Sequence, residues 1–120
     1  MKLERLGAAD FDGEQLRRPG TWAVAFSADW CPFCRAFEPE FEKLRGSGSF
    51  EVAIADMTDM ETPLWERFQV DVVPTVVVFR DGKPSFRRDG KLGRGLADSD
   101  LTAVRQELAR GSPPSGRAPI

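Results

Sequence analysis

The chain has 120 residues, of which 41% are hydrophobic and 30% are charged, and its formal net charge is −2. This length is typical of one domain whose core needs no disulfide staples. The near balance of 17 basic and 19 acidic residues argues against a whole-protein electrostatic footprint for nucleic acid or an anionic membrane. No apolar run is long enough to cross a membrane, and the charged start at Met1–Leu6 is unlike a signal peptide, so we expect a cytoplasmic protein. A monomer is the default expectation.

The first half of the chain is predicted to alternate strands with helices. Residues 22–27 are apolar almost throughout, which is typical of a strand covered on both faces. Phe37, Phe41 and Leu44 recur at the spacing of one helical face, and Pro39 is expected to kink that helix. The predicted elements in chain order are a strand at Leu3–Leu6, a helix at Asp10–Arg17, a strand at Trp22–Ser27, a helix from Cys34 to about Arg45 and a strand at Phe50–Asp56.

The second half is predicted to add antiparallel strands. Asp81-Gly82 is a two-residue hairpin signal that joins two predicted strands. The predicted elements are a helix at Thr62–Phe68 with Pro63 at its first position, strands at Thr75–Phe79 and Lys83–Arg88, and a last helix capped by Ser99. An α/β fold with a mixed central sheet flanked by helices on both faces follows, over residues 1–110. Residues 111–120 are expected to be a disordered tail rich in Pro, Gly and Ser.

The only two cysteines, Cys31 and Cys34, stand at the junction between a predicted strand and a predicted helix. Backbone N–H groups and the helix dipole stabilise anions at a helix N-terminus, so the thiolate form of Cys31 is expected to be favoured. Three residues of helix bring Cys34 onto the same face, and Cys34 is expected to be the more buried of the two. The pair can therefore exchange disulfides in two steps, with Cys31 attacking and Cys34 displacing the captured partner.

The residues alone do not decide between disulfide exchange and other functions of a cysteine pair. A zinc site needs four ligands, and the chain has no histidine and no further cysteine. An iron–sulfur cluster shared between two chains and a pair of inert buried thiols remain as alternatives. We expect no resident cofactor, because the redox group would be the Cys31–Cys34 disulfide itself.

Two blocks of sequence resemble the thioredoxin family. The first is residues 22–44, with an A-x-W-C-x-x-C-R run and a proline, Pro39, five residues after the second cysteine. The second runs from Val72 to Gly82 and contains a Val-Pro-Thr run before a predicted strand. The resemblance covers about residues 3 to 110 and implies the thioredoxin fold.

The resemblance also implies roles for the residues of the first block. Cys31 would be the attacking thiol and Cys34 the resolving thiol. Trp30 would shield the pair as the aromatic residue beside it. Pro32 and Phe33, between the two cysteines, would lie at the substrate surface. Phe33 is expected to point outward, where it could contact substrate or merely pack on the helix end.

In the second block, Val73 would offer backbone groups to an extended substrate segment. Pro74 matches the family's cis-proline, which shapes the loop facing the cysteines and keeps them from capturing a metal. Gly90 or Gly93 would match the glycine that lines the substrate groove.

The sequence departs from the family pattern at three places. The pair between the cysteines is Pro32-Phe33, where typical thioredoxin has Gly-Pro. Ala25 stands where thioredoxin has a buried aspartate, and Val52 or a neighbour replaces the partner lysine. Without that acid, the proton of Cys34 must leave through water or another group, and the loss of a nearby negative charge is expected to raise the reduction potential.

The function expected from the cysteine pair and the resemblance is thiol–disulfide exchange that reduces or rearranges protein disulfides. The expected partners are protein disulfide substrates and a reductase or small-thiol electron donor, with no nucleic acid and no membrane. The alternative is a binding or redox-switch module of thioredoxin fold without general turnover.

Overall fold

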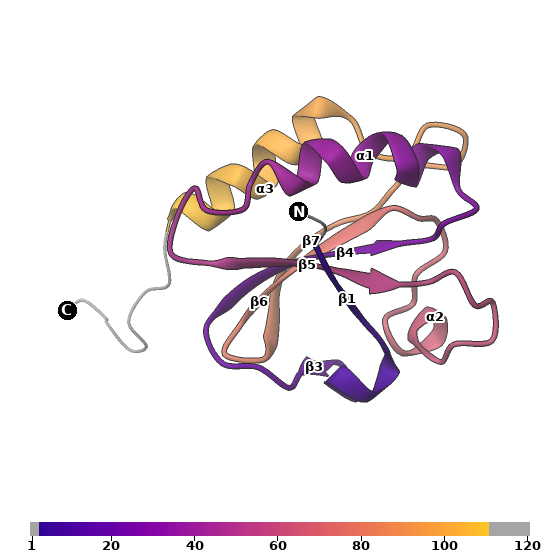
Figure 1. The fold of residues 1–120 in the computed structure, drawn as a ribbon, viewed down its shortest axis with the longest axis horizontal. Coiled ribbons are helices and arrows are strands. Elements are labelled where there is room, and N and C mark those ends of the chain that lie inside the picture. The colour runs from indigo at the N-terminus through magenta and orange to yellow at the C-terminus, as the bar shows by residue number, and fades with distance from the viewer. Residues whose placement is uncertain (1–2, 111–120) are drawn as a thin grey trace.

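The computed structural model describes residues 3–110, which form a five-stranded sheet with helices on both faces and a separate two-stranded hairpin (Figure 1). The strand order in the large sheet is β1-β5-β4-β6-β7. Its strands are β1 (Glu4–Leu6), β4 (Thr21–Ser27), β5 (Glu51–Asp56), β6 (Thr75–Arg80) and β7 (Lys83–Arg88). The first three run parallel, while β6 and β7 are antiparallel to their neighbours, so the predicted mixed sheet is confirmed.

The helices divide the core into two layers. The helices α1 (Pro32–Glu42) and α3 (Asp98–Ala109) lie side by side over one face of the sheet, and the short α2 (Leu64–Arg67) lies on the other (Figure 1). Successive side chains of a strand point to opposite faces. Accordingly, Ala23 and Ala25 of β4 belong to the core under α1 and α3, whereas Val24 and Phe26 belong to the opposite core. The central strand β4 is therefore covered on both sides, as its apolar run predicts.

The predicted helix at Asp10–Arg17 is wrong. The segment forms one short 3-10 helix, η1 (Ala8–Asp10), followed by a hairpin of β2 (Phe11–Asp12) and β3 (Gln15–Leu16). Gly13, in an Asp-Gly turn, has a φ of +61°, a left-handed conformation that breaks a helix and suits a hairpin. Phe11 and Leu16 pair across this hairpin and are both buried, whereas residues five apart lie on different sides of a helix.

Two other helix starts differ from the prediction. Helix α3 is capped at Ala97 and begins at Asp98, so Ser99 lies inside it. The carboxylate of Asp100 accepts a hydrogen bond from the Ala97 amide at 2.8 Å and thereby satisfies a donor at the helix end. Helix α2 is only four residues long, and Pro63 is its cap and not its first helical residue.

The aromatic residues Trp22, Trp65, Phe26, Phe41, Phe68 and Phe79 are buried to different extents. The phenylalanines are buried, namely Phe26, Phe41, Phe68 and Phe79. Trp22 and Trp65 are half-buried. Their indole N–H groups donate to the carbonyls of Pro19 at 3.0 Å and Asp59 at 3.3 Å, and these acceptors lie at the surface end of each side chain. A tryptophan needs a partner for its N–H, which favours such a partly exposed position.

Asp100 provides a pH-dependent contribution to the stability of the fold. Burial alone would raise the pKa of Asp100, but the Ala97 amide and the Arg88 guanidinium outweigh it, and the pKa lies below its ordinary value. The Arg88 Nε atom donates to Asp100 Oδ1 at 3.0 Å. Because the folded pKa is lowered, this stabilisation is present above the unfolded pKa of about 3.9 and is lost as pH falls through the folded value.

We therefore expect Asp100→Asn to lower the free energy of unfolding by about 1 kcal/mol above about pH 5, because the amide loses the charge-assisted part of both hydrogen bonds. The difference from the wild type should vanish by about pH 2. Urea unfolding at several pH values measures it. Asp98→Asn, an exposed change in the same helical turn, is the control and should cost only a few tenths of that. An Asp100 effect that is independent of pH would contradict this account.

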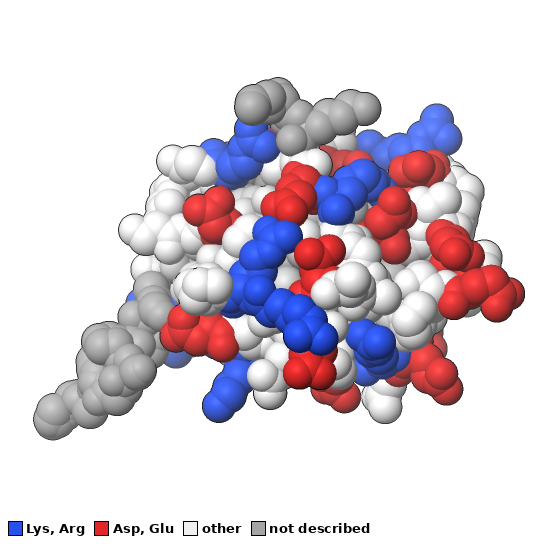
Figure 2. Space-filling model, turned by 60° about the horizontal axis from the view of Figure 1, so that its bottom comes forward, with Lys and Arg blue, Asp and Glu red and all other residues white. Residues whose placement is uncertain are grey.

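The surface carries charges of both signs. On the face shown in Figure 2, blue basic and red acidic side chains are interspersed. Among residues 3–110, no helix is long and apolar enough to span a membrane. The predicted tail at residues 111–120 lies outside the described residues.

Candidate active site

Cys31 occupies the N-cap position of α1, where the chain leaves β4 and enters the helix. The Cys34 amide donates a hydrogen bond to Cys31 Sγ at 3.3 Å, as a backbone donor of the first turn does to an N-cap side chain. Pro32 is the first helical residue, where its missing N–H leaves no donor unsatisfied. The Cys31 thiol donates to the Val73 carbonyl at 3.6 Å. The sulfur of Cys31 therefore lies where helix donors can stabilise a negative charge.

Cys34 is buried one turn further along α1. It is 0% exposed and Cys31 is 5% exposed, so Cys34 is the more buried of the two, as expected. Both are free thiols. Burial raises the pKa of Cys34 to about 12, and hydrogen bonds with Ser27 and with the Ala28 amide, at 3.4 Å for the latter, act in the opposite direction. At neutral pH Cys34 is therefore a protonated thiol that must lose its proton before it can attack a disulfide.

This difference predicts a slow and unusually pH-dependent alkylation of Cys34. In a Cys31→Ser variant at pH 7, we expect Cys34 to react with iodoacetamide about a thousandfold more slowly than free cysteine, because only the thiolate reacts. The rate should continue to rise above pH 9, where an ordinary thiol has nearly levelled off. Mass spectrometry of timed samples measures the alkylation rates of Cys34 and of free cysteine. The same variant unfolded in urea is the control, in which Cys34 should react like free cysteine. A plateau below pH 9 in the folded protein would contradict the prediction.

The loop before β6 faces the cysteines. The Val73–Pro74 peptide bond is cis, and the Val73 carbonyl is the acceptor for the Cys31 thiol. Gly95 completes this side of the site, since a Cβ atom placed on it would lie 2.8 Å from Phe33 Cβ and 3.4 Å from Pro74 Cδ.

The resemblance predicts that the glycine lining the substrate groove is Gly90 or Gly93. Gly90 does approach the loop, where an added Cβ would lie 2.4 Å from the Pro74 carbonyl oxygen, but no atom lies within 4 Å of a Cβ on Gly93. It is Gly95 that packs against both Phe33 and Pro74.

Exposed aromatic side chains surround the buried pair. Trp30 is 49% exposed and Phe33 is 42% exposed, so Phe33 points outward as predicted. Trp30 is held by a hydrogen bond from its Nε1 atom to the Thr58 carbonyl at 2.9 Å, and its ring stacks on Trp65 at 6.3 Å between centroids. The site is thus a buried sulfur pair with two exposed aromatic side chains next to it in the chain, of which Trp30 is held in place.

The position of the missing acid is occupied by hydrocarbon side chains. Ala25 is paired with Ile54 of β5, and Val52, expected in place of the lysine, is paired with Ala23. The structure supplies a carboxylate from another element. Glu38 of α1 is half-buried and accepts a hydrogen bond from the Ser27 hydroxyl.

Sequence reasoning missed this Ser27–Glu38 pair, although two signals for it exist. Ser27 is a hydroxyl residue in a strand that is otherwise apolar after its first residue. Glu38 follows Cys34 by four residues, the spacing that places two side chains on one helix face.

A cysteine pair at the N-terminus of a helix, opposite a cis-proline loop on a mixed sheet, defines a dithiol protein of thioredoxin fold. In residues 3–110, no group of three or more His, Cys, Asp or Glu side chains is arranged to hold a metal ion. The family model for thioredoxin matches residues 3–100. The chain belongs to the thioredoxin family.

Individual relatives agree with this assignment. Protein disulfide-isomerase A6 of Mus musculus is 29% identical over 104 residues, which cover 84% of this chain and 24% of that protein. Thioredoxin of Rhodospirillum rubrum is 29% identical over 91 residues, covering 75% of this chain and 88% of that protein. The crystal structure of Chlamydomonas reinhardtii thioredoxin f2 shares the fold with a TM-score of 0.72 and 20% identity, covering 92% of this chain and 99% of that one. The chain spans about a quarter of the length of the mouse isomerase.

Proposed function

We propose that this protein is a thiol–disulfide oxidoreductase that reduces or exchanges disulfides of protein substrates through Cys31 and Cys34. The observation that carries the proposal is the unequal placement of the two sulfurs. Cys31 accepts a backbone hydrogen bond at the helix N-terminus, while Cys34 is fully buried with its pKa raised to about 12. Cys31 is thus suited to attack the substrate first, and Cys34 stays protonated until it attacks the mixed disulfide.

In the first step, the Cys31 thiolate attacks one sulfur of a substrate disulfide. A bond forms between Cys31 Sγ and that sulfur, and the other substrate sulfur leaves as a thiolate. In the second step, Cys34 loses its proton and attacks Cys31 Sγ. The Cys31–Cys34 disulfide forms, the second substrate sulfur leaves with the bonding electrons, and the substrate has gained two electrons. The donor that reduces the protein again would be a reductase or a small thiol.

We assign the substrate surface to the residues around Cys31. Trp30 and Phe33, adjacent in the chain to Cys31 and Cys34, offer exposed apolar area, and such area suits the side chains of a protein segment. Pro32 lies exposed between them at the start of α1. On the loop side, Val73 and Pro74 place backbone groups next to the cysteines, where an extended segment can form main-chain hydrogen bonds.

Reduction of insulin by dithiothreitol tests the proposed activity. The protein should accelerate the appearance of turbidity as the insulin chains separate and precipitate. A folded, reduced protein that leaves the rate at that of dithiothreitol alone would contradict the proposal and favour a binding or redox-switch module. The cytoplasmic location and the monomeric state stay predictions.

A further inference from the structure

We propose that Ser27 and Glu38 form a proton relay that removes the thiol proton of Cys34 during the resolving step. The inference rests on the proposed function, because it assigns residues to one of its two steps. It answers a question that the sequence raises. Cys34 must lose a proton, yet Ala25, at the expected acid position, and its strand partner Ile54 offer no group that could accept it.

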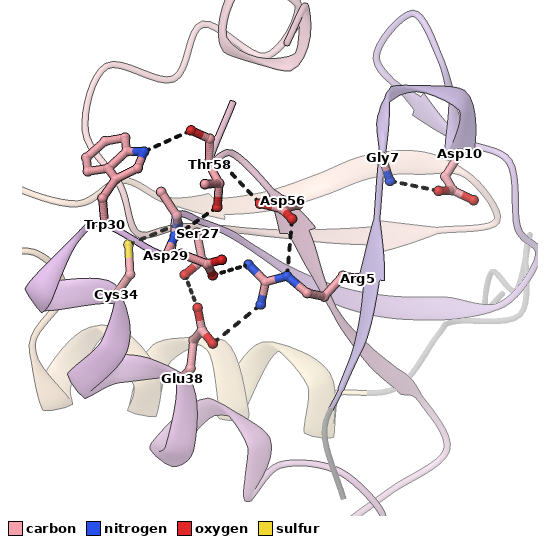
Figure 3. A network of polar contacts seen from close by, with 11 residues as sticks. Arg5, Gly7, Asp10, Ser27, Asp29, Trp30, Cys34, Glu38, Asp56 and Thr58 are labelled. Carbon is pink, nitrogen blue, oxygen red and sulfur yellow. Dashed lines mark hydrogen bonds and ion pairs between the residues drawn. The ribbon is translucent and has the colours of Figure 1, made fainter. Parts of the chain in front are cut away.

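The three side chains form a continuous path from the buried sulfur to a carboxylate. Ser27, the last residue of β4, is 0% exposed, and its side chain is close enough to Cys34 to lower the pKa of that thiol. The amide of the next residue, Ala28, donates to Cys34 Sγ at 3.4 Å. Its hydroxyl donates to Glu38 Oε2. Glu38 lies one turn beyond Cys34 on α1, and Figure 3 shows it reaching back toward Ser27.

The relay moves one proton without leaving a charge on the serine. A hydroxyl has one donor and two acceptor sites, so Ser27 can accept the Cys34 S–H while donating to Glu38. When Cys34 attacks Cys31 Sγ, its proton passes to the Ser27 oxygen and the Ser27 proton passes to the Glu38 carboxylate. Ser27 is again neutral, Glu38 is protonated, and the Cys34 sulfur has become the thiolate that displaces the substrate sulfur. The protonated Glu38 then returns its proton to solvent.

A network of charges fixes Glu38 in position for this transfer. Arg5 Nη1 lies 3.6 Å from Glu38 Oε1, which leaves the other oxygen of Glu38 facing Ser27. Arg5 is itself held by Asp29 at 3.2 Å and by Asp56 at 3.3 Å (Figure 3). Arg5 therefore acts as a positioning residue for the carboxylate.

Glu38 also has an outlet to solvent. It lines a hollow of about 390 Å³ together with Arg5, Arg35 and Pro39, and its side chain is 26% exposed. The titratable and charged groups that face Cys34 and Glu38 from the surrounding elements are Cys31, Arg5, Asp29, Arg35, Glu42 and Asp56. The buried end of the path thus meets the sulfur, and the open end meets water.

Single-turnover reaction with dithiobis(nitrobenzoate), a chromogenic disulfide, separates the two steps. Attack by Cys31 releases a first coloured thiolate, and attack by Cys34 on the resulting mixed disulfide releases a second. For Ser27→Ala and Glu38→Gln we expect the first phase to stay unchanged. The second phase should slow by about tenfold to a hundredfold at pH 7, the effect typical of a lost general base. Glu40→Gln, an exposed change on the same helix, is the matched control and should leave both phases unchanged.

The pH profile of the second phase distinguishes a relay from a merely structural role. In Glu38→Gln the second phase should rise about tenfold per pH unit, because hydroxide must then remove the proton, while the wild type should rise much less steeply. Equal second phases in wild type and both variants, or parallel pH profiles, would overturn the relay. A wild type that releases no first equivalent would instead overturn the proposed function.

Discussion

Replacing Cys31 by serine is expected to reduce the rate of insulin reduction to that of dithiothreitol alone. The variant loses the attacking sulfur, which accepts a hydrogen bond from the Cys34 amide at the N-terminus of α1. Cys34 cannot take over, because it is 0% exposed and burial raises its pKa to about 12. Initial rates of turbidity, with circular dichroism to verify the fold, measure the loss.

Replacing Cys34 by serine is expected to give a different defect. Cys31 still attacks, but nothing displaces the captured substrate, so a mixed disulfide should accumulate in stoichiometric amounts and turnover should stop after one event. Non-reducing mass spectrometry after incubation with oxidised insulin detects the adduct at Cys31. Trapping by Cys31→Ser instead, or equal trapping by both variants, would contradict the assigned order of attack.

Replacing Phe11 by alanine is expected to lower the free energy of unfolding by about 3–5 kcal/mol, the usual cost of removing a buried phenylalanine ring. Phe11 is 2% exposed, and its ring lies 5.2 Å from Phe68, 5.9 Å from Phe79 and 6.1 Å from Phe26, measured between centroids. These contacts join the β2–β3 hairpin to the core beneath the sheet. The loss would be a large fraction of the stability of a small protein.

Equilibrium unfolding in urea measures this effect, and Phe33→Ala is the matched control. Phe33 is 42% exposed, so its truncation should cost less than about 1 kcal/mol while weakening contact with substrate. If Phe11→Ala cost no more than Phe33→Ala, the hairpin would not be an integral part of the core.

The central part of the fold is predictable because its signals are local. The apolar run of β4, the β-branched residues of β6 and the Asp81-Gly82 turn each fix an element by short-range chemistry. Both turn residues have positive φ, 52° and 90°, as a tight hairpin of this kind requires. Asp12-Gly13 is a turn signal of the same kind, and the helix predicted at Asp10–Arg17 did not take it into account.

Some site residues can likewise be predicted from local sequence motifs, whereas others depend on tertiary contacts. The cysteines and Pro74 lie in motifs that are contiguous in sequence, so their proximity could be expected. Glu38 could not be assigned from its helix alone, because its environment depends on Arg5 of a different element. Contact between Gly95 and Phe33 likewise depends on how the loop before α3 folds back over α1. Such long-range contacts are set by tertiary packing, which a local pattern does not encode.

Titration of the protein in buffers of reduced and oxidised glutathione tests the central claim most directly. Samples quenched with an alkylating agent and weighed by mass spectrometry report the state of Cys31 and Cys34 at each ratio. We predict a single reversible two-electron transition between two free thiols and an internal disulfide that joins them. Thiols that stay reduced at every ratio, or that form only adducts with glutathione, would contradict the account.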